Sequence, residues 1–355
     1  MGIKNLSKFL RDTCPEIFQE IHISEFAYKK VAVDTSLYMY HYKAILAENW
    51  LSGFVKLVAL LRQYNVHCVF IYDTKAPMEK TEERKERASS REKLEERLDL
   101  LQDAMQKYHT EGVIDKLLFE FQAKRKLNIP TLSGKNIFNE KGVEEAIKNM
   151  SRQVFSITPE DFSLTKQLFD ILDVPYFSAP MEAETMCSDL CIQGKVDAVM
   201  SEDTDVLAYG TPVFLTKING LNGSCVKIEY QDLLEKLNVK SDEFLDFCIM
   251  CGTDYNKNIF RVGPKKAFEL ISRFENIETI AEKTVYDISI LNHIRGRELF
   301  RGYEKYEGKI SYCGVPKFSE LEIFLAKKNI KLNMDNLKKN FLHVEIVIEE
   351  EGNVE

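Results

Sequence analysis

The sequence has no apolar run long enough to cross a membrane, because its longest apolar stretches, such as residues 66–72, have only the length of a strand. Glycine and proline are scarce, at 16 and 9 of 355 residues, which excludes collagen-like and low-complexity chains. The first residues, MGIKNL, contain no apolar signal segment, and Leu6 stands where a myristoylation signal requires Ser or Thr. We therefore expect an intracellular globular protein of one large or two average domains, with no membrane as partner.

A net positive charge is also lacking. The net charge is −8, so composition alone argues against a nucleic-acid-binding surface and leaves the question to local patches. The six histidines show no ligand spacing, and the eight cysteines fit a reducing compartment. The pairs Cys187/Cys191 and Cys248/Cys251 could each supply half of a zinc site. Both pairs stand in apolar helical sequence, which favours their packing as small core side chains.

Short buried strands alternate with helical sequence along much of the chain. Residues 28–34 and 67–73 each fit a strand ending in Asp, with amphipathic helical sequence over residues 36–63 between them. Further strands are expected at residues 174–179, 197–201 and 212–215, and helices at 162–172 and 182–192. The pattern predicts an α/β fold with a mainly parallel, twisted sheet flanked by helices, whose ligand site lies at the carboxyl ends of the strands.

A helical insertion interrupts this alternation. Residues 79–106 are highly charged and helical in pattern, and residues 127–139, which include Pro130, Ser133, Gly134 and Asn136, predict a flexible loop before a second helix near residues 141–153. Helical sequence follows Asp254, and residues 345–355 form an acidic, frayed tail. We expect five segments: 1–78 and 157–254 as two parts of one core, 79–156 as the insertion, 255–335 as a helical region and 336–355 as the acidic tail.

Carboxylates stand at or just after the ends of the expected strands. They are Asp34, Asp73, Glu182, Glu184, Asp203 and Asp205, joined by Asp254 after an apolar helix. One Asp at a strand end is also a common turn or cap residue, but seven at one edge could not all stay ionised without cations. Oxygen ligands without His or Cys favour Mg²⁺, with Mn²⁺ as a substitute. Two such ions about 4 Å apart suit hydrolysis of a phosphodiester.

Several motifs occur in a characteristic order: MGIKNL at the N-terminus, VAVDTS at 31–36, APMEAE at 179–184, EDTD at 202–205, and GTDY at 252–255 followed by VGPKKA at 262–267. They resemble the flap endonuclease/XPG superfamily of structure-specific 5′ nucleases over about residues 1–80 and 155–275. The resemblance implies a PIN-like nuclease core. It also implies that Asp34, Asp73, Glu182 and Glu184 hold one metal ion and Asp203, Asp205 and Asp254 the second, so that Asp34 and Asp205 count among the catalytic residues.

The insertion resembles the helical arch, or gateway, through which the 5′ single strand passes in this superfamily. Lys80, Arg84, Arg87 and Arg91 recur at spacings of four, three and four residues, so that one helix would present them as a single stripe. The alternative is a solvated helix with salt bridges such as Glu83–Arg87. The resemblance implies that Lys80 and Arg87 are the catalytic basic pair, which stabilises charge in the transition state.

Other positions resemble the DNA-binding parts of the superfamily. Tyr40 matches an aromatic residue that stacks on a base, and a buried aromatic is its alternative. Gly263, with Lys265 and Lys266, matches the helix–turn–helix hairpin that holds the duplex backbone, often with K⁺, although Gly-Pro can also simply start a helix. Gly2 matches a glycine beside the active site that helps to hold bent DNA, which implies removal of Met1.

Some positions depart from the superfamily pattern. Thr74 stands where Gly usually follows the acid, and Arg261 stands where the hairpin usually has its first Gly, which puts the K⁺ site in doubt. The short interval between Asp34 and Asp73 predicts a reduced loop at the DNA junction, and the insertion is longer than in a typical flap endonuclease. Residues 336–355 contain no sliding-clamp-binding motif, so recruitment by a clamp is not expected.

We therefore expect a divalent-metal-dependent 5′ flap endonuclease and 5′–3′ exonuclease that acts on branched DNA, including flaps, nicked or gapped duplexes and junctions. Its context would be replication, recombination or repair, in a nucleus or in a viral or cytoplasmic replication compartment. Two alternatives stay open: a phosphatase with an aspartyl nucleophile, since Asp203-Thr204-Asp205 imitates that motif, and a non-catalytic scaffold that binds DNA junctions.

Overall fold

The computed structural model describes residues 2–127, 129–130 and 136–341. The strands are β1 (Gln19–His22), β2 (Lys30–Asp34), β3 (His67–Tyr72), β4 (Ile129–Pro130), β5 (Asn136–Ile137), β6 (Tyr176–Ser178), β7 (Ala198–Met200), β8 (Val213–Thr216) and β9 (Ser224–Glu229). The helices of the first half are α1 (Leu6–Thr13), α2 (Thr35–Leu46), α3 (Leu51–Gln63), α4 (Thr81–Glu111), α5 (Lys116–Lys124), α6 (Glu140–Ser151) and α7 (Pro159–Leu172). The later helices are α8 (Ala183–Ile192), α9 (Asp205–Ala208), α10 (Tyr230–Leu237), α11 (Ser241–Cys251), α12 (Pro264–Phe274), α13 (Ile277–Lys283), α14 (His293–Arg301), α15 (Phe318–Lys327) and α16 (Met334–Lys339). Short 3₁₀ turns are η1 (Pro15–Ile17), η2 (Ile23–Phe26), η3 (Ala47–Asn49), η4 (Met78–Lys80) and η5 (Ser289–Leu291).

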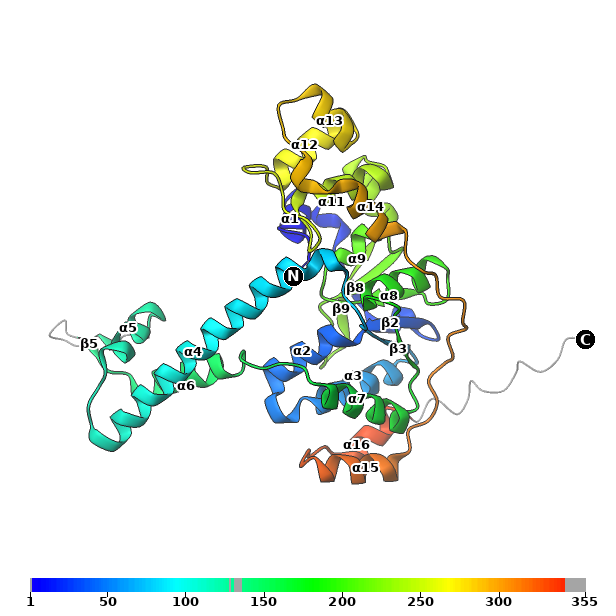
Figure 1. Ribbon diagram of the computed structural model, residues 1–355. Coiled ribbons are helices and arrows are strands. Elements are labelled where there is room, and N and C mark those ends of the chain that lie inside the picture. The colour runs from blue at the N-terminus through cyan, green and yellow to red at the C-terminus, as the bar shows by residue number, and fades with distance from the viewer. Residues whose placement is uncertain (1, 128, 131–135, 342–355) are drawn as a thin grey trace, which may run out of the picture.

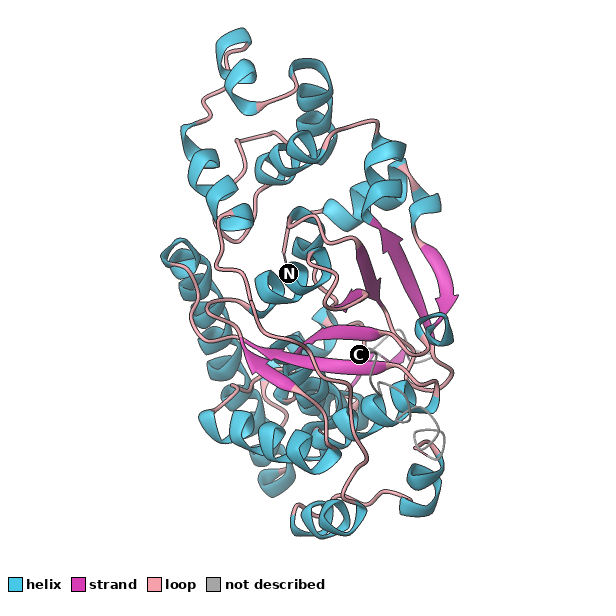
Figure 2. Ribbon diagram, turned by 90° about the vertical axis from the view of Figure 1, so that its right-hand side faces the viewer, coloured by secondary structure: helices cyan, strands magenta, loops and turns pink. Residues whose placement is uncertain are grey.

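A seven-stranded sheet with the order β1-β9-β8-β7-β2-β3-β6 forms the centre of the fold. The neighbours from β8 to β6 pair in parallel, whereas β9 is antiparallel to both β8 and β1. Figure 2 shows the twisted sheet with helices on both sides. The predicted α/β class with a mainly parallel sheet is confirmed, and β1 and β9 add an antiparallel edge that the sequence pattern did not indicate.

Successive side chains of the central strands point to opposite faces of the sheet, so the core is divided between these two faces. Val31 and Phe70 are buried on one face, together with residues of α3, α7 and α15, and Ala32 and Ile71 are buried on the other, together with residues of α8 and α11. All six residues of β3 are buried, as expected for a strand covered on both sides. The two apolar clusters hold the sheet rigidly beneath the loops that follow its strands.

The strand order reverses at β2. The chain passes from β2 to β3 and on to β6 in one direction, whereas β7 and β8 lie on the other side of β2. Such a switch point leaves a crevice at the carboxyl ends of the strands, where ligands bind in open α/β sheets. The residues after β2, β3, β6 and β7 therefore meet at one edge.

The helical sequence expected over residues 36–63 forms two helices rather than one. The structure has α2 and α3, which are bent by 116° relative to each other across a break at residues 47–50. Ala47 at this break has a φ of 49°, a left-handed conformation that an uninterrupted α-helix does not contain. The apolar pattern continues through the break, because both helices pack on the same core, and so the pattern concealed it.

The insertion forms a separate projection, visible in Figure 1 as α4 leading away from the sheet to α5 and α6. Its own small core joins Leu101, Leu118, Phe121, Val143 and Ile147. The buried residues of α4 begin only at Leu98, so the first half of this helix has no buried side chain. Strands β4 and β5 pair within the loop predicted over residues 127–139, while Ser133 and Gly134 lie outside the described residues.

The helices after α11 occupy two places. Helices α12 to α14 lie at one end of the molecule, and α15 and α16 lie at the other (Figure 1). Leu321, Phe324 and Leu337 join the core cluster that contains α3 and α7. The predicted tail of residues 336–355 begins inside α16, and its residues Leu337 and Phe341 are buried in the core. The acidic residues 345–355 lie outside the described part of the chain, and the division into five segments stays a prediction.

In the described part of the chain, no single helix has both the length and the apolar character of a membrane span. Helices α2 and α3 reach that length and composition only when they are counted together across their bend. Leu51–Gln63 contributes eleven buried residues to the core, which accounts for its apolar composition.

Candidate active site

The carboxylates predicted from the strand ends do meet at the switch point of the sheet. Asp34 ends β2 and caps α2, because its Oδ1 accepts a hydrogen bond from the Leu37 backbone N–H at 3.2 Å. Asp73 follows β3, and its Oδ1 accepts from the Ala183 N–H at 2.7 Å, which links two strand ends through the first turn of α8. Asp34 is buried, whereas Asp73 is exposed.

Glu182 and Glu184 stand at the start of α8, where carboxylates are favoured by the helix dipole. Glu182 is buried, and its Oε2 accepts a hydrogen bond of 2.5 Å from the Tyr255 hydroxyl. The hydroxyls of Tyr255 and Tyr209 are in turn 2.9 Å apart. This pair of tyrosines fixes the orientation of Glu182, and sequence analysis missed it because nothing in the motifs marks a tyrosine as a partner of an acid.

Asp203 and Asp205 follow β7 in a tight local arrangement. The Asp205 N–H donates to Asp203 Oδ1 at 3.1 Å, and the Ile3 N–H donates to Asp205 Oδ1 at 2.7 Å. Gly2 lies so close that a Cβ there would overlap Asp203 Oδ1 and lie 2.7 Å from Asp205 Oδ1, and its φ of 80° also favours glycine. The N-terminus is therefore part of the site, as the resemblance implied for Gly2, while the role of the Ile3 amide had no sequence signal.

Basic side chains from the insertion reach the same carboxylates. Lys80, in η4 at the base of α4, places its Nζ 2.6 Å from Glu182 Oε1 and 3.3 Å from Asp254 Oδ2. Arg87 donates from its NH2 to Asp254 Oδ2 at 3.1 Å and also pairs with Glu83. The salt bridge weighed as an alternative for Arg87 thus exists alongside the contact with the acidic site.

Burial and mutual repulsion raise the free energy of the ionised carboxylates in this site. The pKa of Asp34 is raised well above its usual range, mainly by burial and secondly by repulsion from Asp73. The pKa values of Glu184 and Asp205 are also raised, mainly by burial and secondly by repulsion from Asp203. The pKa of Asp203 is raised chiefly by burial. Burial opposes the charge on Lys80, but Glu184, Glu182 and Asp254 outweigh it, so its pKa is raised. The site therefore attracts cations strongly.

Most of these groups border one cleft of about 750 Å³ between the sheet edge and the first half of α4. Asp205 is not part of its lining, because it is buried next to Asp203, whose Oδ1 accepts its N–H. Its lining includes Asp34, Asp73, Lys80, Arg84, Arg87, Arg91, Glu182, Glu184, Asp203, Asp254 and Tyr40. Tyr40 is 45% exposed, so the buried alternative is wrong, and its ring lies 5.9 Å from that of Phe155. The donor set around the acids consists of carboxylate oxygens without His or Cys, which fits hard divalent ions rather than zinc.

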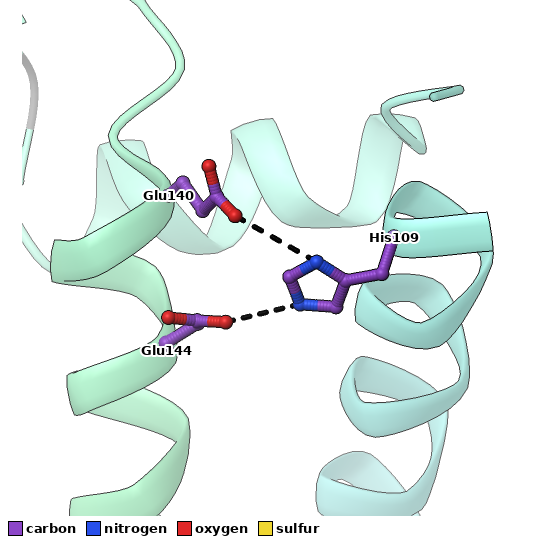
Figure 3. Close-up of side chains that lie close together, drawn as sticks. All are labelled: His109, Glu140 and Glu144. Atoms are coloured by element: carbon purple, nitrogen blue, oxygen red, sulfur yellow. Dashed lines mark ion pairs between the residues drawn. The ribbon is translucent and has the colours of Figure 1, made fainter. Parts of the chain in front are cut away.

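The four cysteines considered as zinc ligands are not among the residues that line the cleft. Cys187, Cys191, Cys248 and Cys251 are buried, free thiols within the apolar cluster on the α8 and α11 side of the sheet. The histidines show no ligand spacing in the sequence, but one of them meets two carboxylates in the fold. His109 lies 3.0 Å from Glu144 and 3.6 Å from Glu140, where α4 meets α6 (Figure 3). These two contacts join residues that are 31 and 35 positions apart in sequence, and they lie outside the cleft.

Comparison with known proteins identifies the family. The XPG N-terminal domain matches residues 1–94, and the XPG I-region matches residues 173–254. A probable RAD2-like endonuclease, 369L, of Invertebrate iridescent virus 6 is 33% identical, covering 96% of this chain and 92% of that protein. The chain belongs to the flap endonuclease/XPG superfamily. This superfamily member is also 28% identical to flap endonuclease 1 of Aedes aegypti, over 93% of this chain and 86% of that protein.

The fold of this superfamily member matches solved structures as well. The catalytic core of Rad2 in complex with a DNA substrate superposes with a TM-score of 0.65 at 16% identity, covering 96% of this chain and 98% of that one. The predicted class, a metal-dependent structure-specific 5′ nuclease, is confirmed by the family. The phosphatase alternative is therefore wrong.

The hairpin of this superfamily member lies between α11 and α12. Gly263 caps α12, and Lys265 and Lys266 are exposed in its first turn. Arg261 has a φ of 62°, the left-handed conformation that a glycine adopts most easily. The turn that departs from the superfamily pattern at Arg261 therefore keeps a glycine-like backbone.

Proposed function

We propose that this nuclease cuts DNA at the junction between a duplex and a 5′ single-stranded flap, leaving a 5′-phosphate and a 3′-hydroxyl. The observation that carries the proposal is the cleft itself, in which buried carboxylates face a row of basic side chains on the unpacked half of α4. Hydrolysis of a phosphodiester needs both kinds of group. Basic side chains stabilise the negative charge that develops in the transition state, and carboxylates hold the metal ions that activate the attacking water.

Two divalent ions, Mg²⁺ in preference and Mn²⁺ as a substitute, are the proposed cofactors. Asp34, Asp73, Glu182 and Glu184 would hold one ion, and Asp203, Asp205 and Asp254 the other. When bound, the ions supply an activated water and stabilise the leaving oxygen. The raised pKa values of Asp34, Glu184 and Asp205, caused by burial and then by neighbouring carboxylates, support a cation site here, because a bound cation offsets both costs.

The chain's own residues would position the substrate. Lys80 and Arg87 already contact Asp254, so they are within reach of a phosphate held there, where they stabilise the developing charge. Arg84 and Arg91 extend this charge along the cleft, and exposed Tyr40 offers a ring on which a base can stack. Gly2 allows the N-terminal backbone to approach Asp203 and Asp205 closely.

The duplex next to the cut would lie against the hairpin. Gly263 and the exposed Lys265 and Lys266 present a helix N-terminus and positive charge, which suit a phosphate backbone. We propose K⁺ as a further ligand of this hairpin. The biological context would be replication, recombination or repair in a nuclear or a viral or cytoplasmic replication compartment, without recruitment by a sliding clamp.

The test is a panel of end-labelled DNA substrates: 5′ flap, nicked and gapped duplex, four-way junction and single strand. We expect the 5′ flap to be cut fastest, at its base, by wild-type protein with Mg²⁺. Asp205→Asn should bind the flap and leave it uncut, whereas Asp99→Asn, which changes an exposed acid on α4, serves as the matched control. Binding of every branched substrate without cutting by the wild type would replace the proposal with the scaffold alternative.

A further inference from the structure

One aromatic side chain on the hairpin is largely exposed to solvent. Phe260 is 81% exposed, although it follows directly after the buried Ile259. The guanidinium of Arg261 lies 5.1 Å from the centre of the Phe260 ring. A single exposed aromatic side chain does not by itself require a partner, so the reason to expect one lies in the rigidity of the turn and the charge around it.

The backbone around this ring is tightly held. The Val262 N–H donates to the Ile259 carbonyl at 3.0 Å, closing a turn whose two central residues are Phe260 and Arg261. The Asn258 side-chain amide donates to the carbonyls of Ile259 and Val262 at 3.2 and 3.0 Å. Ile259 and Val262 are buried on either side, so the two exposed side chains stand on a rigid turn.

The charge around the turn indicates what covers it. Residues 255–268 contain Lys257, Arg261, Lys265 and Lys266 but no Asp or Glu, and Glu269 just beyond them pairs with Lys266 at 3.1 Å, which leaves Arg261 and Lys265 as the net positive charge next to Phe260. Such a local excess of positive charge complements a polyanion. Lys257 also pairs with Glu82 on α4 at 3.3 Å, which ties the turn to the base of the arch.

The position of the turn limits where on a nucleic acid it can reach. Phe260 is six residues from Asp254 along the chain, and an extended chain spans at most about 3.6 Å per residue, so the two lie within about 22 Å. Duplex DNA rises about 3.4 Å per base pair, so this distance corresponds to about six base pairs.

We propose that Phe260 enters the minor groove of the duplex within about six base pairs of the cut, with Arg261 beside it. Apolar side chains on rigid projections enter this groove in other DNA-binding proteins, and arginine favours its negative potential. The inference rests on the proposed function, because it places the duplex arm of that substrate on this turn. Phe260 would act as a positioning residue that fixes the distance between the duplex and the acids.

Kinetics with flap DNA separate this role from a structural one. Phe260→Ala should raise KM about tenfold, as for partial loss of a buried ring, and leave kcat nearly unchanged. Phe260→Leu should restore most of the loss. Because no charge is removed, the dependence of KM on salt should keep its slope, whereas Lys265→Ala should lower that slope by about one. Leu221→Ala, at a 96% exposed side chain on the turn between β8 and β9, is the matched control.

A cross-link reads the contact without any cleavage. Phe260→p-benzoylphenylalanine, placed in an Asp205→Asn background, should cross-link to a base within about six base pairs of the junction, and a minor-groove ligand should block it. A wild-type enzyme that cuts flaps, together with an unchanged KM for Phe260→Ala and no cross-link, overturns this inference and leaves the proposed function intact. Failure of the wild type to cut any branched DNA overturns the proposed function, and the cross-link then still decides whether Phe260 touches duplex.

Discussion

Removing one buried charge from the acidic site should stabilise the metal-free protein while it abolishes cleavage. Asp205 is 2% exposed, and its Oδ1 accepts the Ile3 N–H at 2.7 Å. Asn keeps this hydrogen bond, because its amide oxygen can occupy the same place, so Asp205→Asn removes charge with little change of shape. The neighbouring carboxylates of Asp203 and Asp254 then lose a repulsive partner.

The size of the effect follows from Coulomb's law. Two unit charges about 5 Å apart at an effective dielectric constant of about 20 repel each other by about 3 kcal/mol. Lys80 offsets part of this repulsion at the same site, so we expect a gain of about 1–2 kcal/mol in the free energy of unfolding without metal. For a chain of this length, such a gain corresponds to a rise of about 1–3 °C in Tm.

The pH dependence gives the prediction a sign. The pKa values of Asp34, Glu184 and Asp205 are raised in the folded state, so folding favours their protonated forms. Their contribution to the stability of the metal-free protein is fully present below the ordinary carboxyl pKa values and is lost as pH rises through the raised ones. The Tm advantage of Asp205→Asn should therefore be small near pH 4 to 5 and grow toward pH 8.

The assay is thermal unfolding in EDTA across this pH range, with Asp99→Asn as control. Adding Mg²⁺ should reverse the order of Tm values, because binding stabilises the wild type by about 2.7 kcal/mol at a concentration one hundred times Kd and the variant by less. A variant that is less stable than the wild type in EDTA, or an advantage independent of pH, would refute the reasoning.

Three further substitutions test other parts of the account. Lys80→Met removes the ammonium that lies 2.6 Å from Glu182, so it should lower the metal-free Tm, tighten Mg²⁺ binding in calorimetry and slow cleavage; unchanged Mg²⁺ affinity would contradict it. Arg87→Ala should reduce kcat for flap DNA by about 100-fold with a small change in KM, and the opposite split would make Arg87 a phosphate anchor only. Asp246→Ala removes the buried carboxylate that pairs with Arg297 Nη2 at 2.5 Å, so it should lower the free energy of unfolding in urea by about 3 kcal/mol. A decrease below about 1 kcal/mol would show that water replaces the pair.

The central strands and their acids could be predicted because both signals are local. β3 is buried at every residue, and Asp34 and Asp73 stand at the ends of short apolar runs whose length and β-branched residues favour strands of a covered sheet. The edge strands gave no such signal: β1 has the sequence QEIH with one side chain in four apolar and none fully buried. Their pairing depends on β8 and β9 already being in place, which is a property of the fold rather than of the segment.

The partners of the acids lay beyond local patterns as well. The hydrogen bond from Tyr255 to Glu182 joins residues 73 apart, and the one from Ile3 to Asp205 joins residues 202 apart. Nothing in the sequence indicates that this backbone amide or this tyrosine hydroxyl donates a hydrogen bond to an acid of the site. The Ala47 break between α2 and α3 was missed for a different reason, since apolar residues on both sides of it pack on one core.

The most direct test of the central claim is the Mg²⁺ dependence of cleavage of a 5′ flap labelled at both ends. The account predicts that wild-type protein cuts at the base of the flap, that the rate rises with Mg²⁺ and vanishes in EDTA, and that Asp99→Asn behaves like the wild type while Asp205→Asn binds the flap without cutting it. Cleavage that persists in EDTA, or that survives Asp205→Asn at the wild-type rate, would contradict the assignment of the buried acids to metal-dependent hydrolysis.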